Sequence, residues 1–152
     1  LKFIEFPQFG LRELKKISKK ISKLTGCILM IDYGYLKPNN QNTLQSVMKH
    51  KRNSLLNNLG KADITAHVNF TLLREFFKKN GLKVKNVITQ KEFLEKMGIV
   101  QRAKIISKKM KFSEQADLYV RLNRLLGSSH MGNLFKVIMA YESQNKNFAG
   151  FE

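Results

Sequence analysis

The sequence predicts an α/β fold. Two apolar runs, Cys27–Ile31 and Leu134–Tyr141, stand between turn-forming residues and show almost no polar alternation, which is typical of strands covered on both faces. Stretches with the spacing of amphipathic helices lie before the first run and between the two runs. The chain has 152 residues, of which 43% are hydrophobic, and this is enough for one core of ordinary size.

The first element expected is a helix over residues 8–24, with lysines on its outer face and Gly26 after its end. Its inner face collects four apolar side chains, Leu14, Ile17, Ile21 and Leu24. A strand over Cys27–Ile31 follows, and Asp32 comes directly after it. Open α/β sheets bind ligands at the carboxyl ends of their strands, so Asp32 is a candidate site residue; alternatively, it only caps a loop.

Residues 36–62 are polar and rich in turn formers, with a partly helical stretch expected over 44–59. Loops of this length are uncommon unless they cover a site. The next stretch, 63–70, alternates polar and apolar residues, which would place Asp63 and His67 on one face of a strand together with Thr65 and Asn69. Asp63 and His67 would there form a proton-transfer pair, or serve only as structural hydrogen-bonding residues.

The second half of the chain is predicted to be mainly helical. Asn69 or Thr71 is expected to cap a helix that ends at Gly81, and Leu82–Lys85 has the alternating lysines of an edge strand. Thr89 and Glu92 match a capping box. Further helices are expected over 99–110 and after a Ser113 cap, the latter with Leu118, Leu122 and Leu125 inward, and residues 142–152 are expected to form a frayed tail.

The net charge of +17 favours anionic partners. However, the cations are 22 Lys and only 6 Arg, and 13 Asn accompany them. Phosphate and base recognition relies heavily on Arg, whereas Lys and Asn rise together on the tolerant surfaces of proteins encoded by AT-rich genes. Nucleic acid is therefore an unlikely partner, and a basic module that binds nucleic acid or protein is kept as an alternative.

Several other classes are excluded or disfavoured. A single cysteine, Cys27, excludes an internal disulfide, and no apolar run is long enough to span a membrane. The three histidines have no metal-ligand spacing, so no metal site is expected. The glycines are never closer than five positions, which leaves no G-x-G turn to hold a nucleotide or adenosyl cofactor. The first residues show no cleavable signal pattern, and a bacterial cytoplasm is the expected location.

Six blocks of residues, taken in order, resemble a known family. The blocks are Glu5–Gln8, Ile31–Tyr35, Thr43–Val47 with His50, Asp63–Phe70, Thr89–Leu94 with Gly98–Ile99, and Met131–Val137. Together they resemble the carboxyl-terminal part of the MidA family of S-adenosylmethionine-dependent methyltransferases. The similarity spans about residues 1–141.

The resemblance implies the carboxyl-terminal half of a class I, Rossmann-like methyltransferase sheet, in one domain over residues 1–141 with a helical insertion at about 89–133 and a tail over 142–152. Cys27–Ile31 would be the fifth strand and 82–88 the sixth. The seventh strand, 134–141, would insert antiparallel between them and leave the sixth at an edge. The free side of the fifth strand would make the isolated chain poorly soluble, or dependent on a partner.

The resemblance also implies a function, that of the substrate-side portion of a protein arginine methyltransferase that uses S-adenosylmethionine. Glu5 and Asp32 are the carboxylates expected to hold or deprotonate a guanidinium, with Tyr33 and His67 shaping the pocket. The family's glycine-rich cofactor loop would precede Leu1. The chain is therefore expected to be part of a longer protein, an inactive gene fragment, or a half that pairs with its own amino-terminal half as a separate chain.

The partners implied are protein substrates. Mitochondrial members of the family assist complex I assembly by methylating an arginine of one of its subunits, so a respiratory complex I subunit is the implied example. An inactive remnant remains the second alternative to the enzyme.

Overall fold

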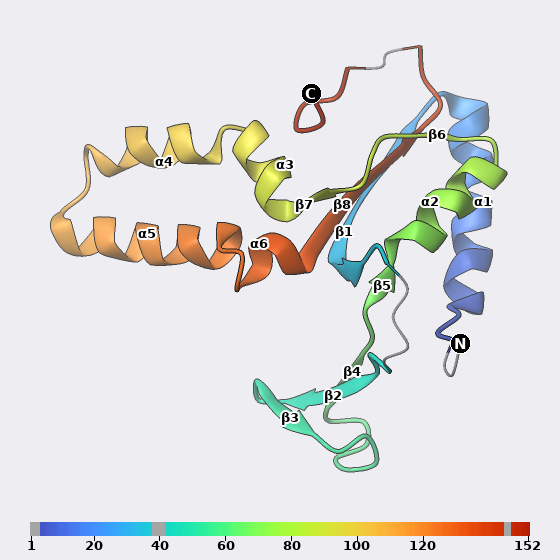
Figure 1. The fold of residues 1–152 in the computed structure, drawn as a ribbon, viewed down its shortest axis with the longest axis horizontal. Helices are drawn as coiled ribbons and strands as arrows, with labels where there is room; N and C mark the ends of the chain where they lie inside the picture. The colour runs from blue at the N-terminus through green and yellow to red at the C-terminus, as the bar shows by residue number, and fades with distance from the viewer. Residues whose placement is uncertain (1–3, 38–41, 145–146) are drawn as a thin grey trace.

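The computed structural model describes residues 4–37, 42–144 and 147–152. It has a central mixed sheet, two helices beside it, a helical arm that projects from one end of the sheet, and a small second sheet (Figure 1). The elements in chain order are α1 (Gln8–Leu24), β1 (Cys27–Tyr35), β2 (Gln45–Met48), β3 (Lys51–Asn53), β4 (Asp63–Thr65), β5 (Val68–Asn69), α2 (Phe70–Lys79), β6 (Lys83–Val84), β7 (Ile88–Thr89), α3 (Gln90–Lys96), α4 (Ile99–Ser107), α5 (Phe112–Leu126), α6 (Met131–Leu134) and β8 (Phe135–Tyr141).

The last strand lies in the middle of the central sheet. β8 pairs antiparallel with β1 along seven positions, from Cys27 opposite Tyr141 to Tyr33 opposite Phe135. On its other side β8 pairs antiparallel with the short strands β6 and β7. The predicted order, with the last strand between the first and the 82–88 segment, is therefore confirmed, and that segment forms the edge as two short strands.

The core lies between one face of this sheet and helices α1 and α2. Phe70, Phe77 and Ile138 are almost completely buried there, and Leu11 and Ile21 bring α1 onto the same cluster. The helix α1 is rotated from the predicted orientation, because Ile17 and Leu24 are exposed while Leu11 and Ser18 are buried. The predicted span of the helix is confirmed. The predicted inward face is wrong by one residue, because Ser18 and not Ile17 faces the core.

The strand β1 differs from the prediction in two respects. It continues to Tyr35, so Asp32 and Tyr33 lie inside the strand and not after it. It is also buried on one face only: Ile28 and Met30 pack on the core, whereas Leu29 and Ile31 are 42% and 45% exposed. The continuous apolar run is thus a true strand, but among the described residues no element covers Leu29 and Ile31 on its second face. On the side away from β8, β1 pairs with β5 at Gly34 and Tyr35.

The predicted helical stretch at 44–59 is wrong. Residues 45–65 form a three-stranded antiparallel sheet in the order β3-β2-β4. Lys49 and His50, between β2 and β3, both have positive φ, 49° and 63°, as a two-residue hairpin turn requires. Such turns usually contain Asn or Gly, and the Lys-His pair gives no such signal in the sequence.

The segment between β7 and β8 is helical, as predicted. α4 and α5 run side by side as an antiparallel hairpin that projects from the sheet (Figure 1). The predicted Ser113 cap is wrong: α5 begins at Phe112, and the Glu114 carboxylate accepts a hydrogen bond from the backbone N–H of Lys111 at 2.8 Å. The inward residues of α5 are those predicted, and they are partly buried against α4.

The frayed tail is also a wrong prediction where the structure describes it. The Phe148 ring lies 4.8 Å from the Tyr141 ring and the Phe151 ring 5.6 Å from that of Phe93. Two aromatic side chains therefore bring the tail back over the sheet and α3. In the described part of the chain, no helix is long and apolar enough to span a membrane.

Candidate functional site

A cavity of about 290 Å³ opens at the carboxyl end of β1. Its lining comes from the segment before α1, the end of β1, the β5 strand and the first turn of α2. Most of the lining is apolar, and the polar groups are few. The lining residues are Glu5, Phe6, Pro7, Tyr35, Ala66, His67, Val68, Asn69, Leu72 and Leu73. Apolar walls with a few polar groups are the usual composition of a ligand site.

A hydrogen-bonded chain joins two of the predicted site residues through Thr43. The Glu5 carboxylate accepts hydrogen bonds from the backbone N–H of Thr43 at 2.8 Å and from its hydroxyl at 2.7 and 2.8 Å. The same hydroxyl oxygen accepts the backbone N–H of His67 at 2.9 Å. Glu5 is half-buried, so these charge-assisted bonds fix its carboxylate in one orientation.

An aromatic cluster supports the His67 ring. The Tyr33 ring lies edge-on to it, with ring centroids 5.5 Å apart, and Tyr33 makes a second edge contact with Phe135 at 5.6 Å. Edge-to-face packing of this kind holds rings in defined positions. The structure therefore brings Glu5, His67 and Tyr33 into one connected group, although they come from three separate segments.

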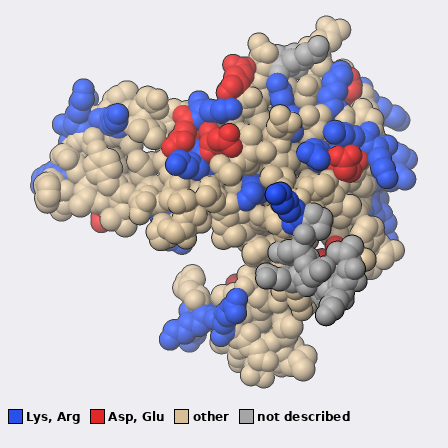
Figure 2. Space-filling model, viewed as in Figure 1, with Lys and Arg blue, Asp and Glu red and all other residues tan. Residues whose placement is uncertain are grey.

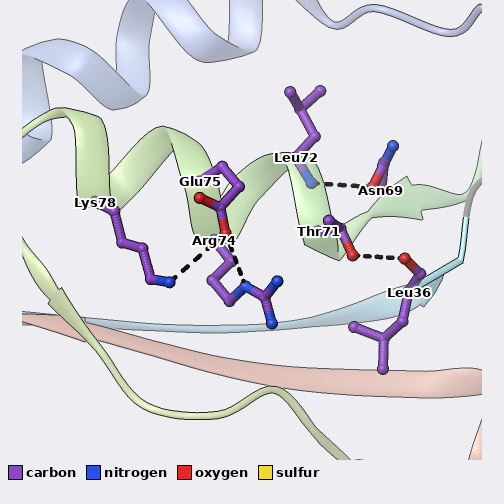
Figure 3. A network of polar contacts seen from close by, with 7 residues as sticks. All are labelled: Leu36, Asn69, Thr71, Leu72, Arg74, Glu75 and Lys78. Carbon is purple, nitrogen blue, oxygen red and sulfur yellow. Dashed lines mark hydrogen bonds and ion pairs between the residues drawn. The ribbon is translucent and has the colours of Figure 1, made fainter.

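The start of α2 forms another wall of the cavity. Asn69 caps the helix by accepting the backbone N–H of Leu72 at 3.0 Å, as the sequence predicted, and the Thr71 hydroxyl donates to the carbonyl of Leu36 after β1 (Figure 3). Farther along the helix, Glu75 contacts Arg74 and Lys78 on the surface (Figure 3). The cap and the Thr71 bond together fix α2 against the end of β1.

Gly34 allows this close approach of β5 and α2. A Cβ atom at this position would lie 2.2 Å from the Val68 carbonyl oxygen and 2.8 Å from the Phe70 ring. Neither group can move away cheaply, because one is backbone and the other is a core side chain. Tyr35, the next residue, lines the cavity, and the pKa of its phenol is raised by burial and by the nearby Glu5 charge, with a hydrogen bond to Asn69 opposing the rise.

The structure does not bring the other predicted carboxylates into this group. Neighbouring residues of a strand point to opposite faces, so Asp32 is directed away from the face of Tyr33; its carboxylate accepts the backbone N–H of Tyr33 at 2.8 Å. Its cross-strand partner is Lys136, whose pKa is lowered by burial. Asp63 is exposed in β4, and no hydrogen bond joins it to His67. Of the two alternatives for Asp63 and His67, the geometry gives no support to a proton-transfer pair.

A second, more polar cavity of about 430 Å³ adjoins the first and shares His67 with it. Thr43, Gln45, Arg52 and Asn53 are among its lining residues. Thr43, Tyr35 and Asn69 were not singled out as site residues from the sequence. All three do lie in blocks that carry the family resemblance, which is the one signal that pointed to them.

The basic side chains are spread over the molecule. Figure 2 shows Lys and Arg over the outer side of α1, the β2–β3 hairpin, the helical arm and the middle of the visible face, where Asp and Glu lie beside some of them. Among the described residues, no group of three or more His, Cys, Asp or Glu side chains is arranged to hold a metal ion.

Comparison with known proteins decides the family. Residues 2–88 match the model of a family of S-adenosyl-L-methionine-dependent methyltransferases. The chain belongs to this family. The matched region contains the whole cavity lining and the Glu5–Thr43–His67 group, so the site lies within the part that defines the family.

Curated relatives agree with this assignment. The mitochondrial protein arginine methyltransferase NDUFAF7 of Xenopus tropicalis is 32% identical over 124 residues, which are 81% of this chain and 28% of that protein. The human protein of the same name is 30% identical over 123 residues, or 80% of this chain and 27% of that protein. This chain thus spans less than a third of the length of these curated relatives.

Two solved structures of Burkholderia thailandensis proteins share the fold. One, bound to S-adenosyl-homocysteine, has a TM-score of 0.82 over 96% of this chain and 39% of its own, at 22% identity. The other has a TM-score of 0.80 over 93% of this chain, also at 22% identity. The class I methyltransferase fold that the sequence predicted is therefore shown.

The described residues of this chain do not by themselves fit an adenosyl cofactor. The cavity lining contains no glycine, and no two glycines of the chain stand close enough for a G-x-G turn. Such turns let the backbone approach the cofactor closely. What the described residues offer is an apolar cavity with one oriented carboxylate.

Proposed function

We propose that this chain forms the substrate side of a protein arginine methyltransferase that uses S-adenosylmethionine. The observation that carries the proposal is the half-buried Glu5 carboxylate, held by Thr43 at the wall of an apolar cavity, in a chain of this methyltransferase family. The name of the Xenopus and human relatives, protein arginine methyltransferase, supports arginine as the target.

Glu5 would bind the guanidinium of the substrate. The Thr43 N–H binds one oxygen of the Glu5 carboxylate, and the Thr43 hydroxyl shares its single proton between both oxygens. The lone pair that remains on the second oxygen can accept an N–H bond from a guanidinium. The carboxylate would then take the proton that the methylated nitrogen releases. The apolar walls exclude water around this pair, which strengthens the attraction between the charges.

Tyr33 and His67 would position the substrate and not take part in proton transfer. Their rings pack edge to face, and the His67 backbone N–H is hydrogen-bonded to the same threonine that holds Glu5. Asp32, the second carboxylate predicted for this role, lies on the other face of β1. Glu5→Gln should therefore reduce methylation more than Asp32→Ala does.

The test uses two proteins. In the first experiment S-adenosylmethionine is titrated into this chain alone, and we expect no saturable heat. In the second, this chain replaces the matching segment of the Burkholderia thailandensis protein that binds S-adenosyl-homocysteine. The chimera is given labelled S-adenosylmethionine and a cell extract, and the labelled proteins are hydrolysed to identify methylated amino acids. We expect methylarginine, and a loss of at least tenfold in its formation with Glu5→Gln.

Glu13→Gln is the matched control, because Glu13 is an exposed carboxylate of α1 that contacts only Arg12 and Lys16. It should leave methylation unchanged, and both variants should still bind S-adenosyl-homocysteine. Saturable binding of S-adenosylmethionine to this chain alone would overturn the assignment of the chain to the substrate side. A chimera that binds the product but methylates a residue other than arginine would overturn the target.

A further inference from the structure

The helical arm presents an apolar surface that nothing in the described chain covers. α5 has two apolar faces: Leu118, Leu122 and Leu125 pack toward α4, and a second stripe points the other way. This outer stripe is defined by Phe112, Ala116, Tyr119 and Val120, which follow the helical spacing of one face. Phe112 is 87% exposed and Val120 is 69% exposed.

Phe112 stands at the tip of the arm. It is the first residue of α5 and follows the turn from α4, at the end of the hairpin farthest from the central sheet (Figure 1). Its ring makes none of the aromatic contacts that hold Phe93, Phe148 or Phe151 in place. A large apolar side chain this exposed, continued by a stripe of further apolar residues, marks an interaction surface.

The charge of the tip indicates the kind of partner. Between residues 96 and 113 the chain has six cationic residues and no acidic one. Lys104, Lys108, Lys109 and Lys111 are exposed, and none of them forms an ion pair, whereas Lys16, Lys78 and Lys83 elsewhere do. The nearest acidic residues, Glu114 and Asp117, line a cavity together with Leu118 and Arg121, and Asp117 forms an ion pair with Arg121.

We propose that the tip of the arm docks on an anionic lipid surface. Phe112 would enter the boundary between head groups and acyl chains, with Tyr119 at head-group depth and the tip lysines against the lipid phosphates. Apolar and aromatic residues beside unpaired lysines are the combination that binds helices to such surfaces. The arm projects from the sheet (Figure 1), so its tip can reach a surface without hindrance from the rest of the described chain.

The chain contains no tryptophan, which allows a direct measurement. Phe112→Trp introduces a single fluorophore at the tip, and its emission should shift to shorter wavelength when vesicles of phosphatidylcholine with phosphatidylglycerol are added. Vesicles of phosphatidylcholine alone should cause no shift. Phe9→Trp is the matched control, because Phe9 is 73% exposed on α1, far from the arm, and its emission should not change.

Charge is tested by vesicle co-sedimentation. Lys108→Glu with Lys109→Glu should weaken binding to the anionic vesicles by about tenfold or more, since each lysine near such a surface contributes on the order of 1 kcal/mol. Lys19→Glu with Lys20→Glu, two exposed lysines of α1, makes the same change in net charge and should have little effect. Phe112→Ser should also weaken binding.

Three outcomes would overturn the proposal. The first is equal loss of binding in the α1 and tip variants, which would mean that the net charge alone attracts the chain. The second is unchanged binding of Phe112→Ser. The third is a shift of the Phe112→Trp emission with rising protein concentration in the absence of vesicles, which would mean that a second copy of the chain covers the stripe.

Discussion

Removal of the Thr43 hydroxyl tests whether this residue holds the candidate site together. Thr43→Val keeps the shape of the side chain but deletes the hydroxyl that donates to Glu5 and accepts from His67. A hydrogen bond to a charged group contributes about 1.5–3 kcal/mol, and an unsatisfied buried N–H costs about 1–3 kcal/mol. Both groups are only half-buried, so we expect a total loss of about 2 kcal/mol in the free energy of unfolding.

Urea unfolding followed by circular dichroism measures this loss, and Thr43→Ser provides the control because it retains the hydroxyl. Hydrogen exchange adds a local readout: the His67 amide should exchange faster in Thr43→Val and stay protected in Thr43→Ser. A double-mutant cycle with Glu5→Gln should give a coupling energy of about 1 kcal/mol, since the two residues share the bonds. Wild-type stability and unchanged His67 exchange in Thr43→Val would refute the reasoning.

Three further predictions concern the walls of the cavity. Asn69→Ala removes the cap of α2 and should lower the free energy of unfolding by about 1 kcal/mol in urea, while Asn69→Asp should retain most of it. Gly34→Ala should cost at least about 1–3 kcal/mol, because its Cβ meets Val68 and Phe70; stability equal to wild type would show that β5 moves away freely. Because folding raises the pKa of Tyr35, the unfolded chain loses the phenol proton at a lower pH than the folded chain. The stabilisation that Tyr35 contributes is therefore complete below its ordinary pKa of 10.0 and is lost as the pH rises through the folded-state pKa. Between neutral and strongly alkaline pH, the free energy of unfolding of Tyr35→Phe should therefore fall less than that of wild type. Equal falls would contradict a raised pKa for Tyr35.

The sequence by itself determined the features that depend only on residues close together in the chain. The Asn69 cap and the Thr89 capping box with Glu92 are local, and both are present in the structure. The apolar run at Cys27–Ile31 lies in β1, and the run at Leu134–Tyr141 forms β8 from Phe135 onward, as short apolar runs between turn-forming residues indicate. The order of these strands and the family itself came from the resemblance of six blocks, of which the short Asp63–Phe70 and Met131–Val137 blocks are the most distinctive.

Local sequence patterns did not predict the structure where the residue types typical of that structure were missing. The hairpin turn at Lys49 and His50 contains neither Asn nor Gly, so its positive φ values could not be predicted. The extension of β1 through Asp32 and Tyr33 depends on pairing with Lys136 and Phe135, about 100 positions later in the chain.

The tertiary structure alone decided which predicted residues form the site. Glu5 and Thr43 are 38 positions apart, and Thr43 and His67 are 24 apart, so no spacing rule connects them. Asp32 was the more obvious carboxylate in the sequence, yet strand alternation turns it away from Tyr33. Local preference fixes the helices and strands of this chain; long-range pairing and packing place Glu5, and not Asp32, at the wall of the cavity.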